Sequence, residues 1–329
     1  MCGVVAVRPL FPEDELALTS LYRSVYARTV APGEMSWKHL GGQGHSGFVA
    51  EEAGVLVAHY GGWLRKWQGG PHRGRAVVAL DAMTAPSHRG RGLFGALVRE
   101  AHDHWRELGV SVVLGLPNSP SVAKAQRLRP IPRLRLSRMQ AHLGPPSRLL
   151  GAALASAFRR RGPLRWVRRL NSRLATAGRG LHWLPFDQLP LPSLQLSNGL
   201  VRDLPWLRWR YQEHPLSPYR AFGIKEDRGE WSAWGVVRLA GRDPGVAQVA
   251  EIHGSARAKV SLLAALLEQD PPGIQRFEAF LPAADRLPAR CAGFWLRRQD
   301  APVHAAILSG DASPFLEAAS LHWGDFDLV

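Results

Sequence analysis

The sequence is poor in cysteine, in lysine and in long hydrophobic runs, and the shortages exclude several classes of protein. Its 329 residues contain two cysteines, Cys2 and Cys291, too few for a disulfide framework or a cysteine-based metal cluster, and no metal ion is expected. No uninterrupted apolar run of about 18 residues occurs, so a membrane-spanning helix is not expected. Residues 1–8 lack the regions of a signal peptide and predict a first strand, which favours a cytoplasmic location.

The charge is strongly positive, at +15, yet only five of the 42 basic residues are lysine. A basic protein attracts anions, nucleic acids among them. Few lysines beside much Ala, Gly, Pro and Trp are also typical of a GC-rich genome that encodes its cations as arginine. The charge therefore indicates an anionic ligand without choosing between nucleic acid and a small molecule. No aromatic–basic recognition motif favours nucleic acid.

The first half of the chain alternates predicted strands and helices. Strands are expected at residues 4–8, 47–51, 55–60, 76–84 and 110–116, and helices at 12–27, 92–108 and 119–128. The strands at 76–84 and 110–116 are almost continuously apolar, which is typical of strands buried on both faces. This order predicts an α/β fold of the α+β type, and the chain length favours two domains.

Residues 145–180 have a different composition from the rest. They open on Pro145-Pro146 and hold the arginine cluster Arg159-Arg160-Arg161 among apolar residues. We interpret them as a basic helical linker, and a solvated amphipathic helix is favoured over a membrane or nucleic-acid contact. From residue 181 onward the order of predicted elements echoes that of the first half, with a strand expected at 219–225 and a helix at 256–268.

A glycine-punctuated turn joins the strand at 76–84 to the helix at 92–108. Gly90 and Gly92 lack Cβ atoms, so the backbone accepts positive φ angles and lets a bulky anion approach. The free N–H groups of the turn then point at one spot, at the positive end of the helix dipole. Such a nest suits a pyrophosphate, and Arg89 and Arg91 add positive charge.

This turn resembles the cofactor loop of the GNAT superfamily of N-acetyltransferases, R/Q-x-x-G-x-G/A, with Arg89, Gly92 and Phe94 at the fixed positions. Phe94 departs from the small residue usual at the last position. Residues 85–93 are similar to the first domain of the "enhanced intracellular survival" acetyltransferases. The resemblance implies a mixed central sheet flanked by helices, in two tandem GNAT-like domains at 1–144 and 181–329.

The resemblance also implies acetyl-CoA as the cofactor and assigns its contacts. The main chain of Ala82, Met83 and Thr84 would hold the pantetheine arm like an added strand, and Asn118 matches an asparagine that often contacts the cofactor. The pyrophosphate would lie against Arg89, Gly90, Arg91, Gly92, Leu93, Phe94 and Gly95.

The catalytic groups follow the family less closely. The tyrosine that usually protonates the departing thiolate falls on Ala125, which has no proton to give. For the base we predict Asp325 or Asp327, because in some tandem GNAT proteins the chain end returns to the active site, or Asp81 on the cofactor strand. His88 and Tyr60 are further candidates.

The second half lacks the cofactor loop, since its strand at 246–253 leads into a turn with the single glycine Gly254. We expect it to bind no cofactor and to close one wall of the acceptor site. The sequence thus predicts an N-acetyltransferase acting on an amine of a small molecule or sugar. The alternatives are a coenzyme A-binding protein without transfer, suggested by Ala125, and an arginine-rich nucleic-acid binder.

Overall fold

The computed structural model describes residues 4–41, 44–118, 120–143, 180–191, 198–216, 218–226, 228–239, 243–269, 271–310, 312–322 and 325–326. Apart from Gly180, the predicted basic linker at 145–180 lies outside the described residues, as does Asp327. Within the described part, no helix is long and apolar enough to cross a membrane.

The strands and helices predicted from the sequence occur in their expected order, and the structure adds the strand Arg129–His142, which the sequence did not indicate. The strands are β1 (Val5–Pro9), β2 (His45–Glu52), β3 (Val55–Gly69), β4 (His72–Thr84), β5 (Val110–Gly115), β6 (Arg129–His142), β7 (His182–Leu184), β8 (Asn198–Leu200), β9 (Tyr219–Lys225), β10 (Trp231–Arg238), β11 (Val246–Gly254), β12 (Arg276–Leu281) and β13 (Trp295–Ile307). The α-helices are α1 (Glu15–Tyr26), α2 (Leu93–Glu107), α3 (Pro120–Ala125), α7 (Leu204–Leu207), α8 (Ala256–Glu268), α9 (Arg286–Cys291) and α10 (Ser313–Ala318).

Short 3₁₀ and π-helical turns complete the connections: η1 (Pro12–Asp14), η2 (Ser36–Leu40), η3 (Pro86–His88), η5 (Phe186–Gln188), η6 (Arg208–Gln212) and η7 (Ala283–Asp285). The local signals act as expected. Ala53 and Gly54 take the positive φ angles of a tight hairpin turn, and the Asp203 side chain caps α7 by accepting from the Trp206 amide.

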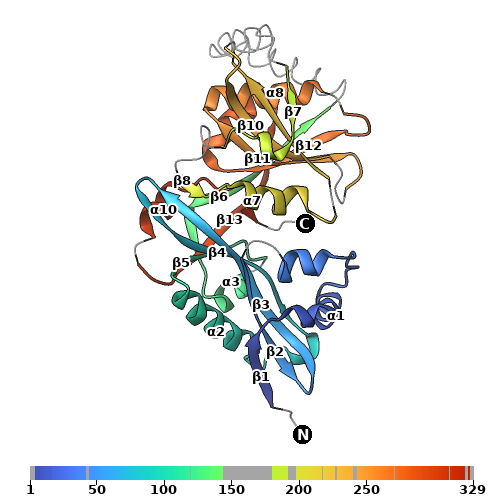
Figure 1. Cartoon of the computed structure of the whole chain (residues 1–329), viewed down its shortest axis with the longest axis vertical. Coiled ribbons are helices and arrows are strands. Elements are labelled where there is room, and N and C mark those ends of the chain that lie inside the picture. Colours follow the sequence, from blue (N-terminus) through green and yellow to red (C-terminus); the bar gives the residue numbers. More distant parts are fainter. Residues whose placement is uncertain are drawn as a thin grey trace.

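One continuous mixed sheet runs through the whole molecule (Figure 1). Its strands lie in the order β1-β2-β3-β4-β5-β13-β6-β12-β11-β10-β9-β7, and β8 pairs with β3 off this path. The two halves repeat one arrangement. In the first, β4 and β5 are parallel and joined through α2; in the second, β11 and β12 are parallel and joined through α8. A mixed sheet flanked by helices confirms the predicted fold class.

The last strand of each half lies among strands of the other half. β13, from the end of the chain, is hydrogen-bonded between β5 and β6. β6, from the first half, is hydrogen-bonded between β13 and β12. The two units expected from the sequence are therefore interleaved through an exchange of final strands.

Helices cover both faces of the first half, as strand alternation requires. On β2, Phe48 and Ala50 belong to the core under α2, whereas Val49 packs with Leu18 and Leu21 of α1 on the opposite face. The side chains of η2 also lie on the α1 face.

A tryptophan-rich cluster joins the two halves. Trp37 and Trp63 of the first half pack against Trp206 and Trp209 of the second, and the Trp37 and Trp209 rings stack with centroids 5.1 Å apart. The Trp37 indole also donates to the Trp209 carbonyl at 2.9 Å. Aromatic pairs of this kind each stabilise by about 0.5–1.5 kcal/mol beyond their area burial.

Because of the strand exchange, we expect residues 1–143 not to fold alone. Without β13, the edge of β5 loses its partner, and the apolar core shared by β5, β6 and α10 is exposed. Expressed by itself, this fragment should be insoluble or lack a cooperative thermal transition, whereas co-expression with residues 180–329 should yield a soluble complex. A monomeric fragment that unfolds cooperatively would contradict the exchange.

Candidate active site

Strands β4 and β5 part in the middle of the sheet. Their parallel pairing ends at Val78 and Leu114, but β4 continues to Thr84 while bound on its other side to β3. Beyond Val78, the second edge of β4 therefore has no strand partner among the described residues. The carbonyl oxygens of Ala82 and Thr84 accept only long bonds from side chains there, 3.4 Å from the Tyr26 hydroxyl and 3.3 Å from Arg89 Nε.

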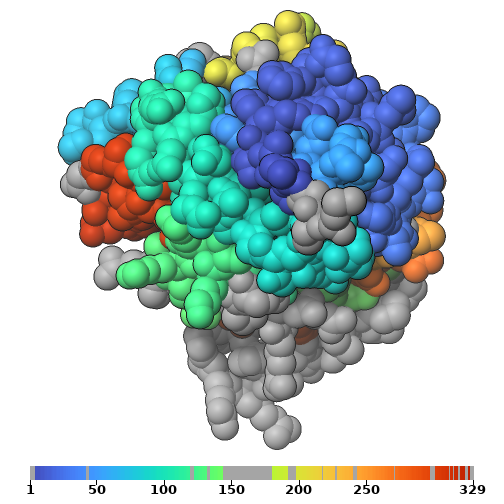
Figure 2. Space-filling model, turned by 90° about the horizontal axis from the view of Figure 1, so that it is seen from below, coloured from blue at the N-terminus to red at the C-terminus, as the bar shows by residue number. Residues whose placement is uncertain are grey.

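The loop after β4 leads into the N-terminus of α2 and is open to solvent. Gly90 and Gly92 have φ angles of +78° and +76°, and a Cβ atom at either position would meet nothing within 4 Å. The first bond of the α2 ladder runs from the Ala96 amide to the Gly92 carbonyl at 3.2 Å, so the amides of the first turn have no intrahelical acceptor. The loop and the helix end have the backbone geometry of the predicted nest, and binding of an anion there stays a prediction. Figure 2 shows that α2, in teal, and the blue N-terminal elements lie side by side on this end of the molecule.

One of the two loop arginines, Arg91, is engaged with the protein itself. Arg91 pairs with Glu52 at 2.7 Å, and His88 binds the same carboxylate at 2.7 Å. Arg91 and His88 lower the pKa of Glu52 to about 2, so the group stays charged at neutral pH. An anion in the nest would therefore find backbone N–H groups and the exposed Arg89, whereas Arg91 and His88 hold the loop to Glu52.

The remaining predicted residues lie around the loop. Leu93, Phe94 and Gly95 form the half-buried first turn of α2, and Asn118 is exposed just beyond β5. The Phe94 ring packs edge-on against Tyr60, with ring centroids 5.5 Å apart. The predicted role of Tyr60 as a base is corrected, because its hydroxyl is fully buried beneath α2 and burial raises its pKa.

Asp81 lies on a bulge of β4 and has a φ angle of +42°, which is unusual for a residue with a side chain. Its carboxylate accepts from Lys38 at 2.6 Å and from His39 at 2.9 Å, both on η2. Burial raises the pKa of this carboxyl, but Lys38 and His39 outweigh burial and hold the pKa well below its usual range. Such a carboxylate holds η2 against β4 and is a weak proton acceptor.

The corresponding turn of the second half is closed. Ser255 caps α8, and its hydroxyl accepts from the Ala258 amide at 3.2 Å. At Gly254, which precedes it, a Cβ atom would lie 2.6 Å from the Ser232 carbonyl oxygen. The absence of a second cofactor loop stays a prediction, and this filled turn supports it.

Sequence comparison agrees with this geometry. The family described as "Acetyltransferase (GNAT) domain" matches residues 6–125. Residues 6–125 form a GNAT acetyltransferase domain. No curated protein matches the chain significantly.

Several solved structures share the fold over nearly the whole chain. A probable N-acyltransferase from Enterococcus faecalis V583 has a TM-score of 0.68 at 12% identity, covering 96% of this chain and 75% of its own. Eis1 from Mycobacterium abscessus has a TM-score of 0.59 at 15% identity, covering 93% and 74%. A tandem GNAT protein from the clavulanic acid biosynthesis pathway has a TM-score of 0.53 at 14% identity, covering 94% and 100%. At such identities the likeness shows the fold alone.

Asp325 bridges the GNAT domain and the second half in a buried ionic network. One carboxylate oxygen binds Arg202 at 2.7 Å, the other accepts from the His322 amide at 2.8 Å, and Arg65 of β3 lies 3.9 Å away. Arg202 in turn binds Glu251 of β11 at 2.9 Å. Asp325 is 0% exposed, with one oxygen in the ion pair to Arg202 and the other bound to the His322 amide, so a structural role is favoured and its role as the base stays a prediction.

We therefore expect Asp325→Asn to lower stability without changing the form of the pH–rate profile. Loss of the carboxylate leaves Arg202 buried without one of its charge partners, and breaking a buried pair typically costs about 3–5 kcal/mol. Urea unfolding measures the loss. The matched control is Asp103→Asn, which breaks an exposed pair with Arg106 and should change the free energy of unfolding by less than about 1 kcal/mol. If Asp325→Asn kept normal stability and lost one limb of the pH–rate profile, the result would support Asp325 as the catalytic base.

Proposed function

We propose that the GNAT domain binds acetyl-CoA along residues 82–95 and that the chain transfers the acetyl group to an amine of a small molecule or sugar. The observation that carries the proposal is the open edge of β4 leading directly into an open glycine loop and helix end. A ligand with an extended arm that forms hydrogen bonds, and with phosphates at the end of that arm, fits an open strand edge followed by an open glycine loop.

The residues present fit that cofactor. The main chain of Ala82, Met83 and Thr84 would bind the pantetheine arm, where only long side-chain bonds now occupy the carbonyls of Ala82 and Thr84. The residues from Gly90 to Gly95 would hold the pyrophosphate, because backbone N–H groups and the helix dipole favour negative charge. Asn118, exposed just beyond the end of β5, would lie across from β4 where the two strands diverge.

Positioning is the main catalytic contribution that the described residues support. Acetyl-CoA would supply the thioester, and holding an amine beside it would convert a bimolecular step into a local one, worth up to about 7–11 kcal/mol in ideal cases. A general acid typically adds about 10²–10⁴-fold. Ala125, exposed at the end of α3, provides none, so we expect a slower transfer than in relatives with a tyrosine at that position.

A second candidate function, binding of coenzyme A without transfer, is favoured by the same Ala125. The two functions are separated by a free-thiol release assay with acetyl-CoA over a panel of primary amines. Release that depends on both the protein and one amine supports transfer. Tight binding of acetyl-CoA with no release above background over the panel would leave the binding function.

We expect Gly92→Glu to abolish binding of acetyl-CoA while the protein stays folded. The new carboxylate faces the pyrophosphate inside the nest, and the side chain enters open space, so it causes no clash. Strain at the positive φ costs about 1–2 kcal/mol. Calorimetric titration and the melting temperature measure the two effects.

The matched control is Gly109→Glu, at the opposite end of α2. Gly109 has a φ of +74° and also meets nothing within 4 Å, so the substitution adds the same charge and strain away from the loop. It should bind acetyl-CoA like the unaltered chain. If Gly92→Glu keeps its affinity within a few-fold at a normal melting temperature, the loop is not the phosphate site.

A further inference from the structure

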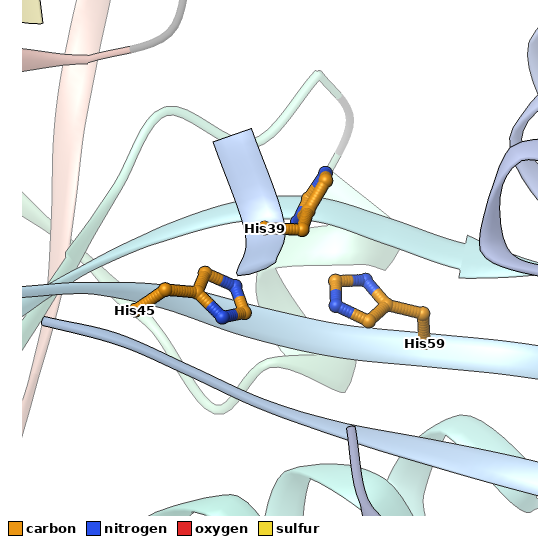
Figure 3. Close-up of side chains that lie close together, drawn as sticks. All are labelled: His39, His45 and His59. Carbon is orange, nitrogen blue, oxygen red and sulfur yellow. The ribbon is translucent and has the colours of Figure 1, made fainter. Parts of the chain in front are cut away.

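Three histidines from separate elements meet on the α1 face of the sheet. His39 comes from η2, His45 from the start of β2 and His59 from β3. The His45 and His59 rings point toward one another, and His39 lies over them (Figure 3). One nitrogen from each ring lies within 4.8 Å of the other two. His39 and His59 are 1% and 0% exposed.

Hydrogen bonds fix the tautomers of two of these rings. His39 binds the Asp81 carboxylate through Nε2 at 2.9 Å, and His59 binds the Asp81 carbonyl oxygen through Nδ1 at 3.0 Å. Both acceptors are oxygens without protons, so each bonded nitrogen carries the N–H. The other nitrogens, Nδ1 of His39 and Nε2 of His59, then present lone pairs when the rings are neutral. A carboxylate or carbonyl that orients a histidine in this way is the usual second layer of a metal site.

The nitrogens that face one another have no hydrogen-bond partner. His39 Nδ1, His45 Nε2 and His59 Nε2 are all buried and unpaired within the described structure. Protonation of His45 and His59 does not resolve this, because burial, together with the neighbouring imidazoles, lowers the pKa of His45 and lowers that of His59 to about 3. Unpartnered buried polar atoms are costly, so three in one place are typical of a site that binds water or an ion.

Two glycines create the room for these rings. Gly47 on β2 and Gly61 on β3 are direct partners in the strand register. A Cβ atom at Gly47 would lie 3.1 Å from His59 Nε2, and one at Gly61 would lie 3.1 Å from His45 Nε2. Larger side chains at these paired positions would therefore fill the space in which the imidazole nitrogens meet.

We propose that His39, His45 and His59 bind a zinc ion, with one coordination position left for water or another small ligand. Imidazole nitrogens suit zinc, whose Zn–N bonds of about 2.0–2.1 Å place tetrahedral ligands about 3.4 Å apart. Binding of zinc would therefore bring the three nitrogens closer together than the 4.8 Å within which they now lie. The sequence alone predicts no metal, because neither cysteines nor a known ligand spacing indicate this site.

The two charged side chains beside the histidines, Lys38 and Asp81, neutralise each other. Lys38 binds the same Asp81 carboxylate as His39, at 2.6 Å, and the pair contributes no net charge. The zinc site would tie η2, β2 and β3 to the bulge at Asp81, one residue before the strand segment assigned to the pantetheine arm. Its existence does not depend on the proposed transfer reaction.

The test is zinc binding by the untagged full-length chain after treatment with a chelator. Titration against a chromophoric zinc chelator should give one equivalent per chain, and zinc should raise the melting temperature. X-ray absorption at the zinc edge should show three imidazoles at about 2.0–2.1 Å. The Co²⁺-loaded protein should show a tetrahedral visible spectrum without a thiolate charge-transfer band.

The variants are His45→Gln, which removes the least buried ligand, and His72→Gln as control, on an exposed part of β4. His45→Gln should lower zinc affinity by about 100-fold or more, and His72→Gln should leave it unchanged. The proposal is overturned if the unaltered chain binds no equivalent of zinc, if His45→Gln binds as tightly, or if a thiolate band appears. Should His45→Gln fail to fold, the absorption data on the unaltered chain decide, and fewer than three imidazoles refute the site.

Discussion

The pairing of β4 with β5 ends at Val78 and Leu114, and each proposed cofactor contact depends on where it ends. A strand hydrogen-bonded on both edges has no main-chain groups to offer a ligand. Because β5 turns away, residues 82–84 keep one edge accessible, and the loop that follows reaches the N-terminus of α2 with its first-turn amides exposed. The proposed binding of the arm and the proposed binding of the phosphates thus both depend on this one break in the strand pairing.

The second half of the chain maintains this break. β13 occupies the other edge of β5, so β5 is held by a strand more than 180 residues away in sequence, between His304 and Ile307. The tryptophan cluster and the network of Arg65, Arg202 and Asp325 fasten β3 to the same half. The second half therefore has a structural task, whether or not it binds a cofactor. Asp325 belongs to that task, because its carboxylate lies buried against Arg202.

Local chemistry made much of the fold and the glycine turn before α2 predictable. The apolar strand before the loop, the two glycines and the periodic helix after them each act over a few residues, and α8 and β9 were predicted at their observed bounds. The strand β6 was missed because it contains Pro130 near its start, and proline is unusual inside a strand. The strand exchange could not be predicted, because no local pattern states which distant strand lies beside β5. The histidine cluster was missed for a similar reason. His39, His45 and His59 have no regular spacing, and only strand register and the bulge at Asp81 bring them together.

The central claim is that one half of this interleaved molecule, and not both, takes the cofactor. Isothermal titration of the full-length chain with acetyl-CoA tests it most directly, because stoichiometry distinguishes the open turn at Gly90 and Gly92 from the turn capped by Ser255. The account predicts one site per chain. Two equivalent sites, or no binding at all, would contradict it.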